Sequence, residues 1–235
     1  VLLAGKALRG FQEAHIQVAG IVEMIHSATL IHDDILDEAT LRRNLPALHT
    51  LHGVEAAVLL GDYVYAAAFG ASTRLADQTC SRVLAETTRV VCQGELTQVL
   101  GRGRVDLSLE EYRGIIAAKT ASLYGAACEL GALYAGAPED TAIRFRAYGV
   151  ALGQAFQIVD DCLDLAGREA AAGKTLGSDV AKGKMTLPLI YIYQKADSKA
   201  KAEMARIFAE IPARDRRGAL EAAFDLPWGD RKSVV

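Results

Sequence analysis

Apolar and polar positions recur with a helical period along nearly the whole chain. Over residues 12–38 the apolar side chains return every three or four positions and form a face too broad for a surface helix. This pattern predicts a helix buried at the centre of a bundle. Residues 53–76 and 79–100 carry similar patterns and predict two more long helices.

Turn and capping signals divide the rest of the chain. Residues 101–104 contain alternating glycines and predict a turn, after which Ser108 and Glu111 form a capping box. The box starts a helix to about residue 135, and a helix over about 140–165 follows a proline-containing break. Shorter helices are predicted over 186–196, 198–211 and 214–224. Strand signals are nearly absent, so we expect an all-α bundle of about eight to ten helices.

The composition narrows the class of protein. The chain has 235 residues, 51% apolar and 23% charged, which suits a single domain over residues 1–235. Its net charge of −3 gives no basic surface for nucleic acid. No apolar run reaches the roughly 18 to 20 residues of a transmembrane segment. The four cysteines lack disulfide-framework or zinc spacing, so we expect reduced thiols in a cytoplasmic protein.

Two aspartate clusters share the pattern I-x-D-D-x-L-D, namely Asp33-Asp34-x-x-Asp37 and Asp160-Asp161-x-x-Asp164. Within each cluster the carboxylates share about one helical turn, where like charges repel one another. Divalent cations offset such repulsion, and magnesium typically takes one or two carboxylates with water and phosphate. Two clusters facing each other would hold several magnesium ions around a diphosphate. The alternative, two acidic helix ends on a solvated surface, is disfavoured by the match between the clusters.

Basic residues follow both clusters. Arg42 and Arg43 come soon after the first cluster, and the planar guanidinium suits phosphate oxygens. Further candidate ligands of phosphate are Lys119, Thr120, Lys174 and Lys184. The last two lie in a glycine-bearing segment over residues 167–185, which we expect to be a mobile loop that closes over phosphates. Any one of these residues alone would more often be a solvated surface charge.

His26 lies seven residues, or two helical turns, before Asp33 and therefore on the same face. Glu23-x-x-His26 also matches half of a di-iron site in a helical bundle, but no second Glu-x-x-His occurs in the sequence. His49-x-x-His52 lacks further ligands nearby, so we expect a loop or surface role for it.

In their order along the chain these motifs resemble those of the trans-isoprenyl diphosphate synthases. The resemblance covers about residues 1–195 and rests on His32–Asp37 with Arg42-Arg43, Gly61-Asp62-Tyr63, Lys119-Thr120, Phe156–Asp164 and Gly183–Pro188. It implies a single-domain helical bundle of the isoprenoid synthase type I fold with a deep central cavity. It also implies an enzyme, usually a homodimer, that condenses isopentenyl diphosphate head to tail with an allylic diphosphate.

The resemblance further implies a role for each candidate residue. Three magnesium ions would bind, two of them to Asp33 and Asp37 and one with the help of Asp160. Supporting ligands would be Asp34, Asp161 and Asp164. The allylic diphosphate would be held by Arg42, Lys119, Gln157, Lys174 and Lys184. Thr120 would lie near the carbon where positive charge develops, and isopentenyl diphosphate would bind Arg43 and His26.

The sequence departs from the family's pattern near its ends. The family usually carries a Gly-Lys-x-Arg-Pro segment before the first long helix, which residues 5–10 do not match. Because the chain begins at Val1 and ends abruptly, we expect the missing segment, and further C-terminal helices, to lie outside it. Asn44 also stands where Gly commonly follows the arginine pair.

The size of two residues bears on product length. Ala28 and Thr29 lie five and four residues before Asp33, where family members that make short products usually carry an aromatic residue that blocks the growing tail. Small residues there imply a product longer than C20. The alternatives are a short-chain farnesyl or geranylgeranyl diphosphate synthase, a terpene cyclase, and a non-catalytic subunit of a heteromeric synthase. Cyclases normally carry a different second metal motif, and non-catalytic subunits typically lose one aspartate cluster, whereas both clusters are intact here.

Overall fold

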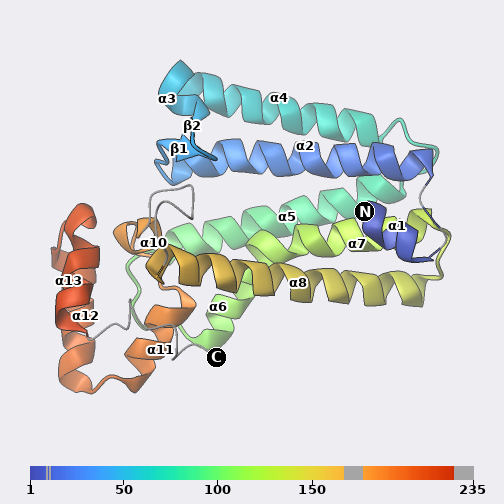
Figure 1. Ribbon diagram of the computed structural model, residues 1–235. Coiled ribbons are helices and arrows are strands. Elements are labelled where there is room, and N and C mark those ends of the chain that lie inside the picture. Colours follow the sequence, from blue (N-terminus) through green and yellow to red (C-terminus); the bar gives the residue numbers. More distant parts are fainter. Residues whose placement is uncertain (9, 11, 167–176, 225–235) are drawn as a thin grey trace. The chain divides into compact units, whose positions relative to one another are not determined.

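The computed structural model describes residues 1–8, 10, 12–166 and 177–224, and these are almost entirely helical (Figure 1). The first helices are α1 (Leu2–Leu8), α2 (Glu13–Leu36), α3 (Leu48–His52), α4 (Val54–Ser72) and α5 (Thr79–Leu100). Next come α6 (Leu109–Ile116), the π-helix η1 (Ala117–Ala121), α7 (Ser122–Tyr134) and α8 (Glu139–Ala166). The last are α10 (Ser178–Ala181), α11 (Leu187–Lys195), α12 (Ser198–Glu210), the 3₁₀ turn η2 (Ala213–Asp215) and α13 (Arg216–Ala223). The predicted all-α class is confirmed.

The helix expected up to residue 135 is interrupted at its middle. Its start is as predicted, because the Ser108 hydroxyl accepts from the Glu111 N–H at 3.1 Å and the Glu111 carboxylate accepts from the Ser108 N–H at 2.9 Å. Between α6 and α7, however, the chain widens into the π-helix η1, which contains Lys119 and Thr120. A π-turn adds a residue to one helical turn and is frequent at functional sites.

A short hairpin follows α2 that the sequence patterns do not predict. Strands β1 (Leu41–Arg42) and β2 (Leu45–Pro46) pair antiparallel. The turn residues Arg43 and Asn44 have φ angles of 52° and 64°. Asn tolerates this left-handed region better than most residues, which accounts for Asn44 at a position where the family commonly has Gly.

The chain divides by its contacts into two compact units. The first comprises Val1–Glu95 and Ile116–Ala155, and the second Leu96–Ile115 and Phe156–Val235. In the first unit α2 packs along α4 and also contacts α7 (Figure 1). Its buried core consists of Val18, Ile21, Ile25, Ala68, Cys80, Leu84 and Leu130. The predicted single-domain organisation and the deep cavity stay predictions.

The second unit has an apolar interior of its own. Its buried side chains include Val180, Leu189, Ile190, Met204, Ile207 and Leu220. Helix α12 contacts both α11 and α13, and its N-terminus is capped by the Asp197 carboxylate, which accepts from the Ala200 N–H at 2.8 Å. This unit therefore carries the helices that follow the second aspartate cluster.

Two helices, α2 and α4, are long and apolar enough to cross a membrane by length and composition alone. Core helices of soluble proteins pass the same test, so this finding does not by itself identify a membrane span. The four cysteines are free thiols, with Cys80 buried and Cys92 exposed.

Candidate active site

The first aspartate cluster lies at the C-terminal end of α2. Asp33 and Asp34 occupy its last turn, and Asp37 is its C-cap, whose backbone N–H donates to the Asp33 carbonyl at 2.7 Å. The helix dipole places partial negative charge at this end, so carboxylates are unfavourable here without compensating cations. Two basic side chains of the first unit supply that compensation.

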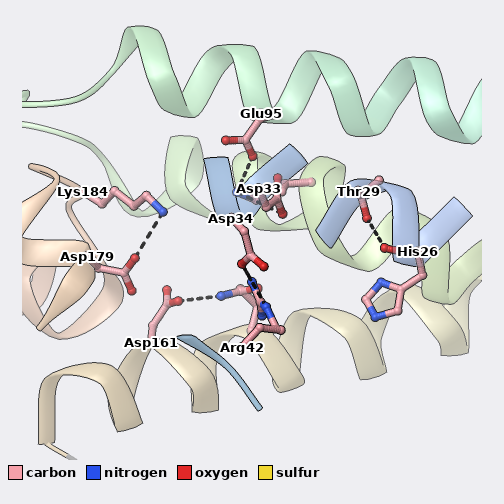
Figure 2. Close-up of polar contacts among 11 residues, drawn as sticks. His26, Thr29, Asp33, Asp34, Arg42, Glu95, Asp161, Asp179 and Lys184 are labelled. Carbon is pink, nitrogen blue, oxygen red and sulfur yellow. Dashed lines mark hydrogen bonds and ion pairs between the residues drawn. The ribbon is translucent and has the colours of Figure 1, made fainter. Parts of the chain in front are cut away.

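Arg42 is the first of these compensating cations. The hairpin β1–β2 brings its Nε to 3.0 Å from Asp34 Oδ1, and its Nη2 pairs with the same oxygen (Figure 2). The Asp34 side chain is only 8% exposed, while that of Arg42 is 41% exposed. The hydrogen bond to Asp34 is the main cause of the raised pKa of the Arg42 guanidinium, which stays charged. Arg42 thus combines a buried contact to a carboxylate with a solvent-facing side suited to an anion.

Lys119 is the second compensating cation, and it has two acidic neighbours. Its Nζ lies 4.0 Å from Asp33 Oδ2 and forms an ion pair with Glu95 of α5. Figure 2 shows Glu95 pointing toward the region of Asp33. All three side chains are at most one-quarter exposed, so the three charges interact through a largely dry environment.

The remaining candidates of the first unit lie along α2 and the hairpin. His26 is partly buried, and its pKa is lowered chiefly by burial, with the charges of Arg43 and Arg42 adding to the shift and Glu23 opposing it. Its backbone carbonyl accepts from the Thr29 hydroxyl at 2.8 Å (Figure 2). Ala28 is completely buried and Arg43 is exposed.

The second cluster lies at the C-terminal end of α8, and within it Asp161 accepts two side-chain hydrogen bonds. The Tyr112 hydroxyl donates to Asp161 Oδ2 at 2.6 Å, and Gln157 Nε2 donates to Oδ1 at 2.7 Å. Burial, followed by the negative charge of Asp179, raises the pKa of Asp161 to about 6, although both hydrogen bonds lower it. Gln157, predicted to bind diphosphate, thus contacts a cluster carboxylate in this structure.

Asp164 and Lys184 both interact with the segment Ser178–Asp179. The Asp164 carboxylate accepts from the Ser178 hydroxyl at 3.3 Å and from the Asp179 N–H at 3.1 Å. Lys184 Nζ lies 3.3 Å from Asp179 Oδ1, and the Lys184 side chain is only 7% exposed (Figure 2). Asp164 therefore holds the start of α10, while Lys184 is buried beside a carboxylate rather than presented to solvent.

Three residues of the site were not predicted from the sequence, namely Glu95, Tyr112 and Asp179. Glu95 offers a weak signal, since it is an acidic residue directly after Gly94 within the long helix α5. Tyr112 offers none. Among the predicted residues, Thr120 lies beside Lys119 in η1, Asp160 is half-buried on α8, and Lys174 lies outside the described residues.

The carboxylates of the two clusters suit magnesium better than a metal whose ligands all come from the protein. Across the described parts of the chain, no three His, Cys, Asp or Glu side chains converge closely enough to hold a metal ion alone. Structural zinc sites normally need four protein ligands and calcium six to eight oxygens. Magnesium typically binds one or two carboxylates and fills its shell with water and substrate phosphate, which the half-buried Asp33 and Asp160 can accommodate.

Comparison with known proteins places the chain in a family. Residues 1–225 match the polyprenyl synthetase family. The chain is 38% identical over 233 residues to heptaprenyl diphosphate synthase component 2 of Geobacillus stearothermophilus, covering 96% of this chain and 73% of that protein. It is 36% identical over 190 residues to the octaprenyl diphosphate synthase of Escherichia coli K12, covering 81% of this chain and 59% of that protein.

A solved structure supports the same assignment. The polyprenyl synthase of Caulobacter crescentus CB15, complexed with calcium and isoprenyl diphosphate, superposes with a TM-score of 0.84 at 36% identity, covering 95% of this chain and 72% of that one. The described helices thus have the isoprenoid synthase fold predicted from the motifs. The chain spans 59% to 73% of the length of the two relatives above. It belongs to the polyprenyl synthetase family.

Proposed function

We propose that this protein is a magnesium-dependent trans-prenyltransferase that condenses isopentenyl diphosphate with an allylic diphosphate to give a trans-polyprenyl diphosphate longer than C20. The observation that carries the proposal is the pair of matching Asp-Asp-x-x-Asp clusters, each at the C-terminal end of a long helix. A carboxylate at that end interacts unfavourably with the helix dipole. The presence of a cluster at two such ends therefore favours a metal-binding role. The names of the polyprenyl synthases reported above support the same chemistry.

Asp33, Asp37 and Asp160 would hold the magnesium ions, three per active site by the family resemblance, with support from Asp34, Asp161 and Asp164. Bound magnesium would neutralise the diphosphate that leaves the allylic substrate. The side chains of the protein contribute further positive charge, from Arg42 with its solvent-facing side and from Lys119. Such preorganised charge stabilises the departing diphosphate more than water does.

Other residues of the chain would bind and orient the substrates. Gln157, Lys174 and Lys184 would contact the allylic diphosphate, and Lys184 would first have to leave Asp179. Arg43 and His26 would bind isopentenyl diphosphate, whose double bond attacks the allylic carbon beside Thr120. A proton is then lost, with the released diphosphate as the acceptor.

The test is a magnesium-dependent assay of the full-length protein with dimethylallyl, geranyl and farnesyl diphosphate as primers and labelled isopentenyl diphosphate. Product length is read by mass spectrometry. We expect turnover to require magnesium, and Asp33→Asn and Asp160→Asn each to lower it by about 10²-fold or more. Asp140→Asn, a surface carboxylate paired with Arg144, is the matched control. No turnover with any primer would overturn the enzyme assignment, and products ending at three or four isoprene units would favour the short-chain alternative.

We further propose that the protein is a homodimer in the cytoplasm. Helix α4 exposes Val54, Val58, Leu59, Leu60 and Tyr63, of which Leu59 and Tyr63 are 68% and 71% exposed. A second copy would cover this apolar surface. The name of the Geobacillus relative favours a heteromeric partner instead. Light scattering of the purified protein distinguishes the two, since a homodimer needs no other chain and Leu59→Asp should dissociate it.

A further inference from the structure

Glu95 has no part in the chemistry proposed above, yet it is paired with Lys119, a central residue of that chemistry. Its carboxylate forms an ion pair with the Lys119 ammonium, and the two side chains are only 15% and 17% exposed. An ion pair so far removed from water interacts more strongly than one at the surface, and losing one partner leaves an uncompensated buried charge.

Close packing between the backbones of α5 and η1 positions the Glu95–Lys119 pair. Gly94 is buried, and a Cβ atom there would lie 2.6 Å from the Lys119 backbone nitrogen and 2.8 Å from Ala118 Cβ. Helix α5 therefore meets the π-helix η1 with no side chain between them, and Glu95 follows directly in the sequence. The position of the Lys119 side chain thus depends on α5 as well as on its own helix.

The same ammonium lies 4.0 Å from Asp33 Oδ2. An ammonium fully paired with Asp33 would occupy a carboxylate oxygen that a divalent cation needs. We infer that Glu95 is a positioning residue that pairs with Lys119 and holds its ammonium back from Asp33, keeping Asp33 available to a divalent cation. This inference rests on the proposed function, because it takes Asp33 as a metal ligand.

The experiment measures Mn²⁺ binding to the full-length protein by electron paramagnetic resonance, with no substrate present. Glu95→Gln should raise the Mn²⁺ concentration for half-saturation about tenfold, as is common when a partner of a ligand is lost. The double variant E95Q/K119Q should bind about as well as wild type, since no ammonium then competes for Asp33. Glu86→Gln is the matched control, because Glu86 lies on the same helix in a surface pair with Arg89 and should leave binding unchanged.

Two results would overturn the inference alone: wild-type Mn²⁺ affinity in Glu95→Gln, or affinity as weak in the double variant as in the single one. The second result would mean that Glu95 supports the fold and does not act by positioning Lys119. If Glu95→Gln does not fold, Glu95→Asp replaces it, and its shortened carboxylate should give an intermediate rise in half-saturation. A wild-type protein that binds no Mn²⁺ would overturn the proposed function as well.

Discussion

Arg42 donates its Nε to the buried Asp34 carboxylate at 3.0 Å, although the motifs imply that its task is to bind diphosphate. The contact joins the hairpin β1–β2 to the end of α2. Because Asp34 is nearly inaccessible to solvent, this guanidinium supplies a hydrogen bond that water cannot. Arg42 therefore has a structural role, as the partner of Asp34, in the protein without substrate.

Replacing Arg42 by Ala should lower the free energy of unfolding by about 1 to 3 kcal/mol, because Asp34 would be left buried without its donor. Arg43→Ala is the matched control, since Arg43 is exposed in the adjacent turn and should cost little. Urea denaturation of both variants checks this. Equal stabilities would show that the Asp34 contact contributes nothing.

The stability of the metal-free protein should depend on pH through Asp161. Its pKa rises from 3.8 to about 6 on folding, mainly because it is buried. Between these values the folded protein retains a proton that the unfolded chain has released, so stability falls as pH rises and the loss is complete above about pH 6. We expect a loss of about 1 to 3 kcal/mol, measured by urea denaturation in EDTA.

Asp161→Asn should remove that part of the pH dependence and make the metal-free protein more stable near neutral pH. The asparagine carbonyl oxygen can still accept from Tyr112. Asp106→Asn, an exposed carboxylate of the same unit, should keep the wild-type profile. An Asp161→Asn profile parallel to wild type from about pH 4 to 7 would refute the assignment.

Gly61 provides the space for His32 against α4. A Cβ atom at Gly61 would lie 2.2 Å from His32 Nε2, which in turn lies 3.2 Å from the Val58 carbonyl. Gly61→Ala should therefore lower stability by about 1 to 3 kcal/mol through overpacking. The control Gly70→Ala lies on the same helix, where its Cβ would meet only Arg74 at 3.8 Å. Adding His32→Ala to Gly61→Ala should restore part of the lost stability. Equal melting temperatures for the two glycine variants would contradict this account.

Product length should respond to aromatic residues before the first cluster. Thr29→Phe should shorten the products toward C15 or C20, because the ring would block the growing tail. Ala28→Phe should also shorten them, but with a loss of about 1 to 3 kcal/mol in stability, because Ala28 is completely buried. Thr29→Ser keeps the hydroxyl that bonds the His26 carbonyl and is the control. Unchanged product masses in both aromatic variants would show that these two positions do not determine product length.

Most of the helices and both clusters could be predicted from the sequence. The helix over residues 79–100 was predicted with its observed ends, and α2 and α8 to within about two residues. Helical periodicity and caps arise from neighbours three or four positions apart, which the sequence displays directly. The placement of Asp33, Asp34 and Asp37 within about one turn at the end of α2 follows from the same local geometry.

Two partners of the cluster aspartates, Tyr112 and Lys119, were decided by tertiary structure alone. Tyr112 and Asp161 are 49 positions apart, and nothing near either residue indicates the other. Lys119 meets Glu95 because Gly94 lets α5 approach a π-turn that apolar periodicity cannot reveal. Local sequence thus determines which side chains share a helical turn, whereas packing between distant segments brings Tyr112 to Asp161 and Lys119 to Asp33.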